Sequence, residues 1–155
     1  MKKVLLIAGI CTLVDQVIKI VLTNILSFGD SITVIKNFFS FTMLQNTGAA
    51  FSILNSNTIF LILMSIVALN LIYWFLIKDK NLTKTETIIY GVLIGGIIGN
   101  LIDRIFHGYV IDYLDFNIFG YNFPVFNLAD MCIVIAAFLI IIMIFKGDKH
   151  DIHSQ

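Results

Sequence analysis

Charged side chains and proline are both scarce in this sequence. Lys, Arg, Asp and Glu together make up 13% of its 155 residues, and there is one proline. Of the ten acidic residues, only Glu86 is a glutamate. So few charges cannot cover the surface of a water-soluble domain of this length, which excludes that class. The formal net charge of zero also gives no field that would attract nucleic acid, so no nucleic-acid partner is expected.

Residues that commonly build disulfides, metal centres and nucleophilic sites are few as well. Cys11 and Cys132 both lie in apolar stretches, which argues against a disulfide framework. The chain has three histidines but no HExxH motif and no Cys/His cluster, so we expect no metal site and no cofactor. A GxSxG nucleophile motif is also absent.

Apolar residues, in contrast, are abundant, at 59% of the chain. A helix needs about 20 apolar residues to cross a bilayer. Four stretches meet this length, at about residues 4–26, 58–77, 86–104 and 125–145. The sequence therefore predicts an all-α polytopic membrane protein with four transmembrane helices, formed as a single domain over residues 1–155.

The positive charges indicate how these helices cross the membrane. Seven of the ten cations lie at the N-terminus, between spans two and three, and at the C-terminus: Lys2, Lys3, Lys78, Lys80, Lys84, Lys146 and Lys149. Four spans bring these three places to one side, which the positive-inside rule identifies as the cytoplasm. The loops at about 27–57 and 105–124, which carry Lys36 as their one cation, then face outward.

Both outer loops are rich in aromatic residues. Residues 31–44, SITVIKNFFSFTML, alternate in part between apolar and polar side chains and predict two short strands. Residues 113–126, YLDFNIFGYNFPVF, are equally aromatic. We expect the two loops to form an amphipathic platform at the outer lipid surface, where Phe and Tyr are favoured.

The third span carries glycines at a four-residue spacing. Gly91, Gly95 and Gly99 fall on one face of a helix. Small residues at this spacing allow close approach of helices in lipid, so this face predicts tight packing against a neighbouring helix.

Polar residues from separate segments gather at one depth. With a rise of about 1.5 Å per residue, they fall in the outer half of the spans or at their outer mouth: Asp15, Lys19, Asn100, Asp103, Arg104, Asp112, Asn127 and Asp130. A charge in a bilayer costs a few kcal/mol or more, so each needs a partner or a task.

Some of these charges suggest local pairs. Asp15 and Lys19 are spaced for a helical ion pair, and Asp103 with Arg104 supplies a second pair of opposite charges. Such pairs could tie helices together, shape a site, or do both.

Asp112 and Asp130 have no evident cationic partner. Two neighbouring carboxyl groups do not both ionise easily and so share a proton. The ionised group can draw a proton from water while the protonated one polarises a peptide carbonyl.

Spacing and depth alone also allow a proton- or cation-coupled transporter, or a non-catalytic membrane assembly factor. A transporter needs a polar path to both sides, and the outer clustering argues against one.

Five segments, in order, resemble the lipoprotein signal peptidases, also called signal peptidase II. They are DQVIK at 15–19, QNTGAAF at 45–51, GGIIGNLIDR at 95–104, GYVIDYLDF at 108–116 and FNLAD at 126–130. The resemblance extends from the first span to the last. It implies a four-helix aspartic endopeptidase with a small extracytoplasmic β-cradle. This enzyme would remove the signal peptide from diacylglyceryl-modified bacterial prolipoproteins, cutting just before the lipidated Cys.

The resemblance also implies roles for particular residues. Asp112 and Asp130 correspond to the catalytic dyad. Other matching positions would bind substrate or support the site: Asp15, Lys19, Asn46, Gly48, Asn100, Asp103, Arg104, Asn127 and Ala129. We further expect a monomer in contact with membrane lipid, multi-pass in the bacterial cytoplasmic membrane. Both termini would be cytoplasmic and the site would lie near the outer leaflet.

Overall fold

Four long helices and a small sheet make up the computed structural model, which describes residues 1–48 and 57–152. The helices are α1 (Lys2–Ile25), α2 (Thr58–Ile72), α3 (Lys84–His107) and α4 (Leu128–Ile152), and a π-helical turn, η2 (Tyr73–Ile77), continues α2. The strands are β1 (Ser31–Ile35), β2 (Phe39–Asn46), β3 (Val110–Ile118) and β4 (Tyr121–Asn122). Each of the four helical segments is long and apolar enough to cross a membrane, which confirms the predicted four-helix architecture.

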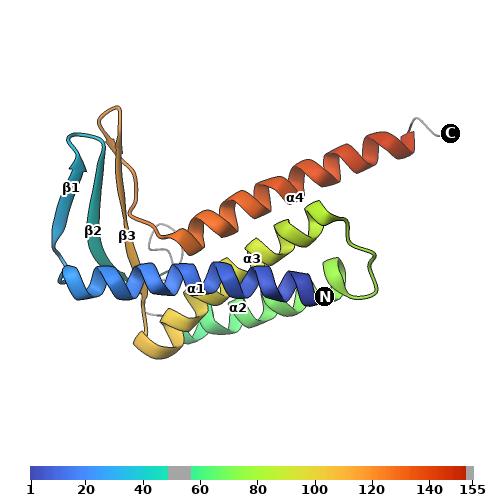
Figure 1. Ribbon diagram of the computed structural model, residues 1–155, viewed down its shortest axis with the longest axis horizontal. Coiled ribbons are helices and arrows are strands. Elements are labelled where there is room, and N and C mark those ends of the chain that lie inside the picture. The colour runs from blue at the N-terminus through green and yellow to red at the C-terminus, as the bar shows by residue number, and fades with distance from the viewer. Residues whose placement is uncertain (49–56, 153–155) are drawn as a thin grey trace.

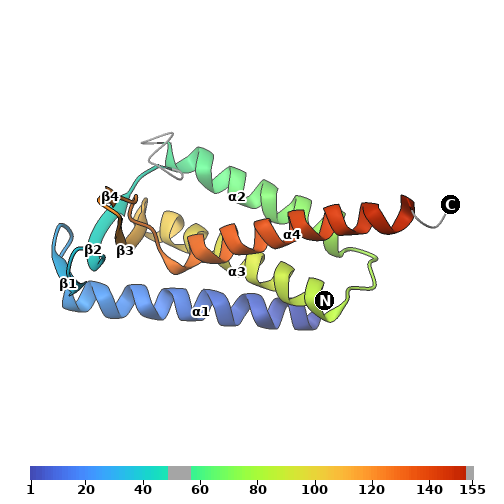
Figure 2. The ribbon, with the colours of Figure 1, turned by 90° about the horizontal axis from the view of Figure 1, so that it is seen from above.

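Helix α3 is the central helix of the bundle and packs against α1, α2 and α4 (Figure 2). It begins with a capping box in which the Thr83 hydroxyl accepts a bond from the Glu86 amide and the Glu86 carboxylate accepts one from the Thr83 amide. It ends at Gly108, whose φ of 81° is the left-handed conformation that glycine adopts at low cost. The chain turns there from α3 into β3.

The predicted glycine face of α3 is confirmed as the contact with α1. A Cβ atom added at Gly91, Gly95 or Gly99 would lie 2.7–2.8 Å from an atom of α1. The two helices therefore approach more closely than any side chain on these positions would allow. Large apolar side chains elsewhere on the helices stay exposed, for example Ile59, Leu6 and Phe138, as expected for surfaces that face lipid.

The sheet is antiparallel in the order β1-β2-β3-β4. Strands β1 and β2 are the two short strands that the sequence predicts within residues 31–44, and they pair as an antiparallel hairpin. Strand β3, which the sequence analysis did not predict, pairs with β2 from Phe39↔Phe116 to Asn46↔Val110. This pairing joins segments far apart in the chain, so local alternation carries little information about it.

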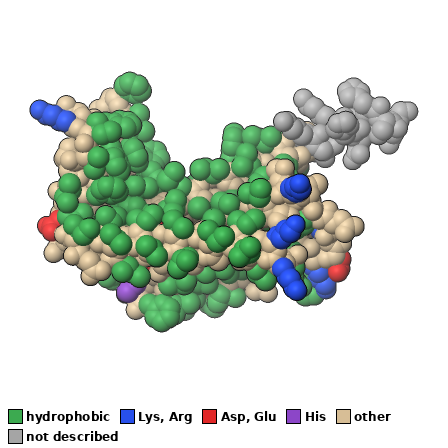
Figure 3. Space-filling model, viewed as in Figure 1, with side chains coloured by type: hydrophobic (Ala, Val, Ile, Leu, Met, Phe, Trp, Pro, Cys, Tyr) green, Lys and Arg blue, Asp and Glu red, His purple; other side chains and the backbone are tan. Residues whose placement is uncertain are grey.

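The sheet lies at one end of the bundle, and both chain termini lie toward the other (Figure 1). Buried Met43, Ile111 and Tyr113 pack it against Leu26 at the end of α1. Basic side chains gather at the end opposite the sheet, over the N-terminus and the connection between α2 and α3 (Figure 3). These are the positions of Lys2, Lys3, Lys78, Lys80 and Lys84.

Candidate active site

Asp112 and Asp130 line the same groove. Asp112 is the third residue of β3, and Asp130 lies in the first turn of α4. The groove has a volume of about 770 Å³ and runs between α2, α3 and α4. At one end it is polar, where Asn46, Asn100 and Arg104 join the two aspartates. Mostly apolar side chains line the rest, and most of them belong to α2 and α4.

Asp112 is almost completely buried, with 2% of its surface exposed. Its Oδ1 accepts a hydrogen bond from Asn127 Nδ2 (2.7 Å), and its Oδ2 accepts one from Asn46 Nδ2 (2.8 Å). Burial, followed by the negative charge of Asp130, raises the pKa of Asp112 to about 7, although the two amide donors and Lys19 act in the opposite direction. A carboxyl group with this pKa can hold a proton near neutral pH.

Asp130 helps to start α4. Its amide donates to the Oδ1 of Asn127 (2.9 Å), and its Oδ2 accepts a bond from the Asn127 amide (3.3 Å). This reciprocal pair is a capping box, and it holds the Asp130 side chain at the positive end of the helix. The other oxygen, Oδ1, accepts a bond from Asn100 Nδ2 (2.7 Å).

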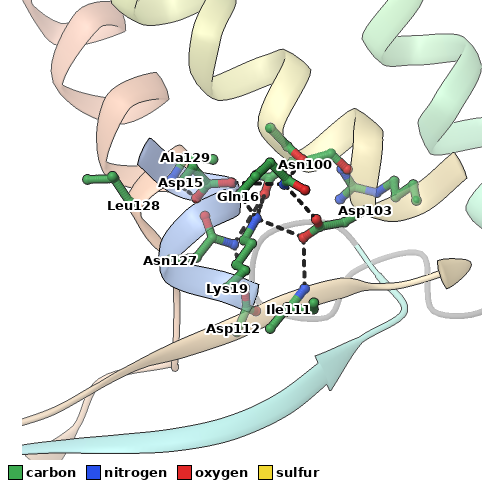
Figure 4. A network of polar contacts seen from close by, with 12 residues as sticks. Asp15, Gln16, Lys19, Asn100, Asp103, Ile111, Asp112, Asn127, Leu128 and Ala129 are labelled. Atoms are coloured by element: carbon green, nitrogen blue, oxygen red, sulfur yellow. Dashed lines mark hydrogen bonds and ion pairs between the residues drawn. The ribbon is translucent and has the colours of Figure 1, made fainter. Parts of the chain in front are cut away.

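A buried ion cluster on α1 and α3 lies close to Asp112 (Figure 4). Lys19 Nζ lies 2.8 Å from Asp15 Oδ2 and 2.7 Å from Asp103 Oδ2. The predicted pair of Asp15 with Lys19 is therefore confirmed. The suggested pairing of Asp103 with Arg104 is wrong, because both ion pairs found within the described part of the chain belong to Lys19.

Arg104 instead contacts backbone carbonyl groups. It donates to the carbonyl oxygens of Gly48 (3.2 Å) and Asn100 (3.5 Å), while the Gly48 amide donates to Asn46 Oδ1 (2.9 Å). Adjacent residues of a helix point in different directions, so Asp103 faces α1 while Arg104 faces the groove. Arg104 thus lines the polar end of the groove, and Gly48 is bonded to it there.

Ala129 joins the ion cluster to α4. It is fully buried, and its amide donates to Asp15 Oδ1 (3.0 Å). A Cβ atom at Gly96 would come within 2.5 Å of the Ala129 carbonyl oxygen, so α3 and α4 also meet closely here. Of the eleven residues singled out from the sequence, five line the groove: Asn46, Asn100, Arg104, Asp112 and Asp130. Lys19, Gly48 and Asn127 bond directly to these five, and the bonds of Asp15, Asp103 and Ala129 connect to them through Lys19.

Sequence reasoning missed the polar contacts of two residues, Gln16 and Tyr113. Gln16 Nε2 donates to Asp103 Oδ1 (2.9 Å) and to the Gly99 carbonyl oxygen (3.2 Å). Its place inside the DQVIK segment was a signal for it. Tyr113 is 2% exposed, and its hydroxyl accepts a hydrogen bond from the Leu128 amide (3.2 Å). Nothing in the sequence distinguishes it from the other tyrosines.

Aromatic rings extend from the groove onto the sheet. Phe126 lines the groove and stacks on Phe116, with ring centroids 5.7 Å apart, and Phe116 stacks in turn on Phe39 (4.7 Å). Phe123 also lines the groove and meets Phe126 edge to face. The polar end of the groove is therefore bounded on the sheet side by a continuous aromatic surface.

Comparison with known proteins identifies the family. A family model described as signal peptidase (SPase) II matches residues 7–146. The lipoprotein signal peptidases of Staphylococcus aureus strains JH9 and Newman are each 39% identical to this chain over 146 residues, which is 94% of this chain and 90% of theirs.

Solved structures agree with this match. Two bacterial membrane enzymes, determined by the in meso method at 2.3 and 1.9 Å resolution, superpose with TM-scores of 0.89 and 0.83. They are 37% and 38% identical to this chain, and the matches cover 97% and 94% of this chain and 92% and 94% of theirs. The resemblance seen in the sequence is confirmed. With its four apolar helices, this chain is a membrane peptidase that belongs to the signal peptidase II family.

Proposed function

We propose that this protein is an aspartic endopeptidase in which Asp112 and Asp130 form the catalytic dyad. One observation carries the proposal. The two carboxyl groups meet at the polar end of an otherwise apolar groove, and neither belongs to an ion pair within the described residues. Carboxyl groups that served only to join helices would be expected to face a cation, as Asp15 and Asp103 do.

The chemistry requires one proton shared between two carboxyl groups and a water held between them. The ionised aspartate removes a proton from the water, which attacks the scissile carbonyl. The protonated aspartate donates to the carbonyl oxygen, and the roles reverse as the intermediate collapses. The pKa of about 7 for Asp112 supports a protonated carboxyl group in the dyad near neutral pH.

The amides and ions around the dyad have supporting roles in this proposal. Asn46, Asn100 and Asn127 donate hydrogen bonds to the carboxylates. Arg104 lies in the groove with N–H groups that can bind a substrate carbonyl. Lys19 is held in the ion cluster by Asp15 and Asp103, and Gly48 and Ala129 supply backbone contacts.

The proposed substrates are prolipoproteins with a diacylglyceryl group, cut just before the lipidated Cys. The names of the similar Staphylococcus aureus enzymes support lipoprotein processing. The groove supports a helical, apolar substrate segment, because Leu61, Met64 and Ala68 of α2 face Met131 and Val134 of α4 across it. A signal peptide has such an apolar segment.

We also propose an orientation in the bacterial cytoplasmic membrane. The chain would act as a single domain and a monomer, with the sheet and the dyad toward the outer leaflet and both termini in the cytoplasm. The support comes from the basic side chains, which gather at the end of the bundle opposite the sheet.

A cleavage assay in detergent or membranes tests the proposed reaction. The substrate is a diacylglyceryl-modified prolipoprotein, with its unlipidated form as a control. Wild type should cut the lipidated form, and Asp112→Asn and Asp130→Asn should lower the rate by roughly 10³-fold or more, because each removes one half of the proton exchange. Mass spectrometry of the products locates the cut.

Asp115→Asn is the matched control, since Asp115 lies on the same strand and bonds to Thr42 Oγ1 (2.7 Å) on the sheet. This variant should cut normally. If Asp112→Asn and Asp130→Asn, once shown to be folded, cut as fast as wild type, another group performs the chemistry. If wild type does not cut at all, ion flux in liposomes tests transport instead.

A further inference from the structure

Three asparagine side chains contact the proposed dyad, and all three present the same end of the amide. Asn46 and Asn127 donate through Nδ2 to Asp112, and Asn100 donates through Nδ2 to Asp130. An amide rotated by half a turn would present its oxygen to the carboxylate instead. Something must therefore hold each amide in the donating orientation.

Each amide oxygen is occupied by a different donor. The Gly48 amide donates to the Asn46 oxygen, and the Asp130 amide donates to the Asn127 oxygen, both at 2.9 Å. These two donors are backbone groups close in sequence. The Asn100 oxygen accepts bonds from Lys19 Nζ (3.3 Å) and Asn127 Nδ2 (3.2 Å).

The ammonium group of Lys19 fixes the orientation of Asn100 by its chemistry. It has three N–H groups and no acceptor, so only the oxygen of Asn100 can face it. Its three N–H groups have three partners, Asp15, Asp103 and Asn100, and 1% of the residue is exposed. The ammonium is thus fully bonded and cannot turn away from Asn100 without losing a partner.

We propose that Lys19 is a positioning residue for the peptidase reaction, which acts through Asn100 by turning the N–H end of that amide toward Asp130. The inference rests on the proposed role of Asp130 in the dyad. It assigns to Lys19 a task beyond neutralising Asp15 and Asp103. With an N–H group facing it, ionised Asp130 is stabilised. With the amide reversed, only protonated Asp130 could bond to Asn100.

Other charged and titratable groups lie around Asp130, and all of them except Asp103 stay in place in the test below. Helix α1 contributes Asp15, helix α3 contributes Asp103 and Arg104, and strand β3 contributes Asp112 and Tyr113. Helix α2 carries no ionisable side chain. A test of Lys19 must therefore keep the net charge of the cluster constant, or a change in field would imitate a change in orientation.

Two variants of equal charge separate orientation from charge. Lys19→Met and Lys19→Gln are each combined with Asp103→Asn, which keeps the net charge of the cluster. Gln retains an N–H donor for the Asn100 oxygen, whereas Met has none. The readouts are kcat, KM and the pH of half-maximal rate on the acidic side of the pH–rate profile.

We expect the Met variant to lower kcat about tenfold or more at pH 7 with KM within about twofold, and to move the acidic half-maximum upward by roughly one pH unit. The Gln variant should keep a higher kcat than the Met variant and an acidic half-maximum closer to that of wild type. Asn100→Leu should reproduce the Met variant, and adding Asn100→Leu to the Met variant should change little more. Asn70→Leu, an exposed asparagine on α2, controls for loss of an amide from a span.

Equal profiles for the Met and Gln variants would overturn the proposal, as would additive effects of Lys19 and Asn100. Thermal unfolding in detergent shows which variants fold. If the Met variant does not fold, the Asn100→Leu variant tests the proposal in its place. An acidic half-maximum that stays at the wild-type pH in Asn100→Leu would then overturn the proposal. The Asp130→Asn variant separates the failure of this proposal from the failure of the proposed dyad. If Asp130→Asn is fully active, the proposed dyad is refuted. If it is inactive, a negative result for the Lys19 variants counts against the role of Lys19 alone.

Discussion

At the residue scale, Asp112 combines a buried position with a group that prefers water. Its 2% exposure penalises the ionised form, and the nearby charge of Asp130 adds to this. Two amide donors offset only part of the cost, so the pKa rises from 3.8 to about 7. The protonation that supports catalysis in this proposal also affects folding stability.

The stability of the protein should depend on pH through Asp112. Its folded-state pKa lies above its unfolded value, so between about pH 4 and 7 the folded protein keeps a proton that the unfolded chain releases. Unfolding free energy therefore falls as pH rises through this window, by up to roughly 4 kcal/mol. Asp112→Asn removes this dependence. The melting temperature of Asp112→Asn minus that of wild type should increase from pH 4 to pH 8, by roughly 5 °C or more.

Thermal unfolding in detergent at several pH values measures this difference, with Asp115→Asn as the control on the same strand. The slope with pH matters more than the offset, because an amide at position 112 also changes the bonds to Asn46 and Asn127. A difference that stays constant or shrinks as pH rises would contradict the prediction.

At the scale of elements, helix α3 carries the site because it can approach two helices at once. Gly99 lies where a Cβ atom would be 2.8 Å from Asp15 Oδ2 and 3.2 Å from Ala129 Cβ. The same residue accepts a bond from Gln16 through its carbonyl oxygen. The contact between helices and the ion cluster near the proposed dyad thus depend on one position without a side chain.

Gly99→Ala should destabilise the protein by roughly 1–3 kcal/mol, because the added methyl group overpacks a closed contact. It should also lower activity by displacing Asp15. Gly9→Ala is the matched control, since it lies on the exposed face of α1 with nothing within 4 Å of an added Cβ. That change should be neutral or stabilising by up to about 1 kcal/mol. Unfolding and cleavage measurements on the pair check this, and equal stability of the two variants would refute it.

At the scale of the whole molecule, the sheet and the basic residues define two opposite ends. Lys36 is exposed at the turn between β1 and β2, whereas Lys80 is exposed in the turn that precedes α3. If the proposed orientation holds, these two lysines lie on opposite sides of the membrane.

Thiol labelling in intact cells tests this orientation. Cys11 and Cys132 are first replaced by Ala, and Lys36→Cys or Lys80→Cys then supplies one thiol. A membrane-impermeant maleimide should label position 36 in intact cells, and position 80 only after the membrane is permeabilised. The reverse pattern would place the dyad at the cytoplasmic side.

The sequence by itself determined the four apolar helices, the glycine face of α3, the β1–β2 hairpin and the residues that gather at the groove. These features depend on local periodicity, on composition and on motifs that hold their order along the chain. The pairing of β3 with β2 and the contacts of Gln16 and Tyr113 were decided by tertiary structure.

The ion cluster illustrates the difference most clearly. Spacing along α1 predicts the pair of Asp15 with Lys19, because residues four apart share a helical face. Spacing also suggested Asp103 with Arg104, yet Asp103 pairs with Lys19 on another helix. Which charges meet across helices depends on how closely α1 and α3 approach. The glycines of α3 allow a close approach, but the resulting pairing of charges exists only in the packed structure.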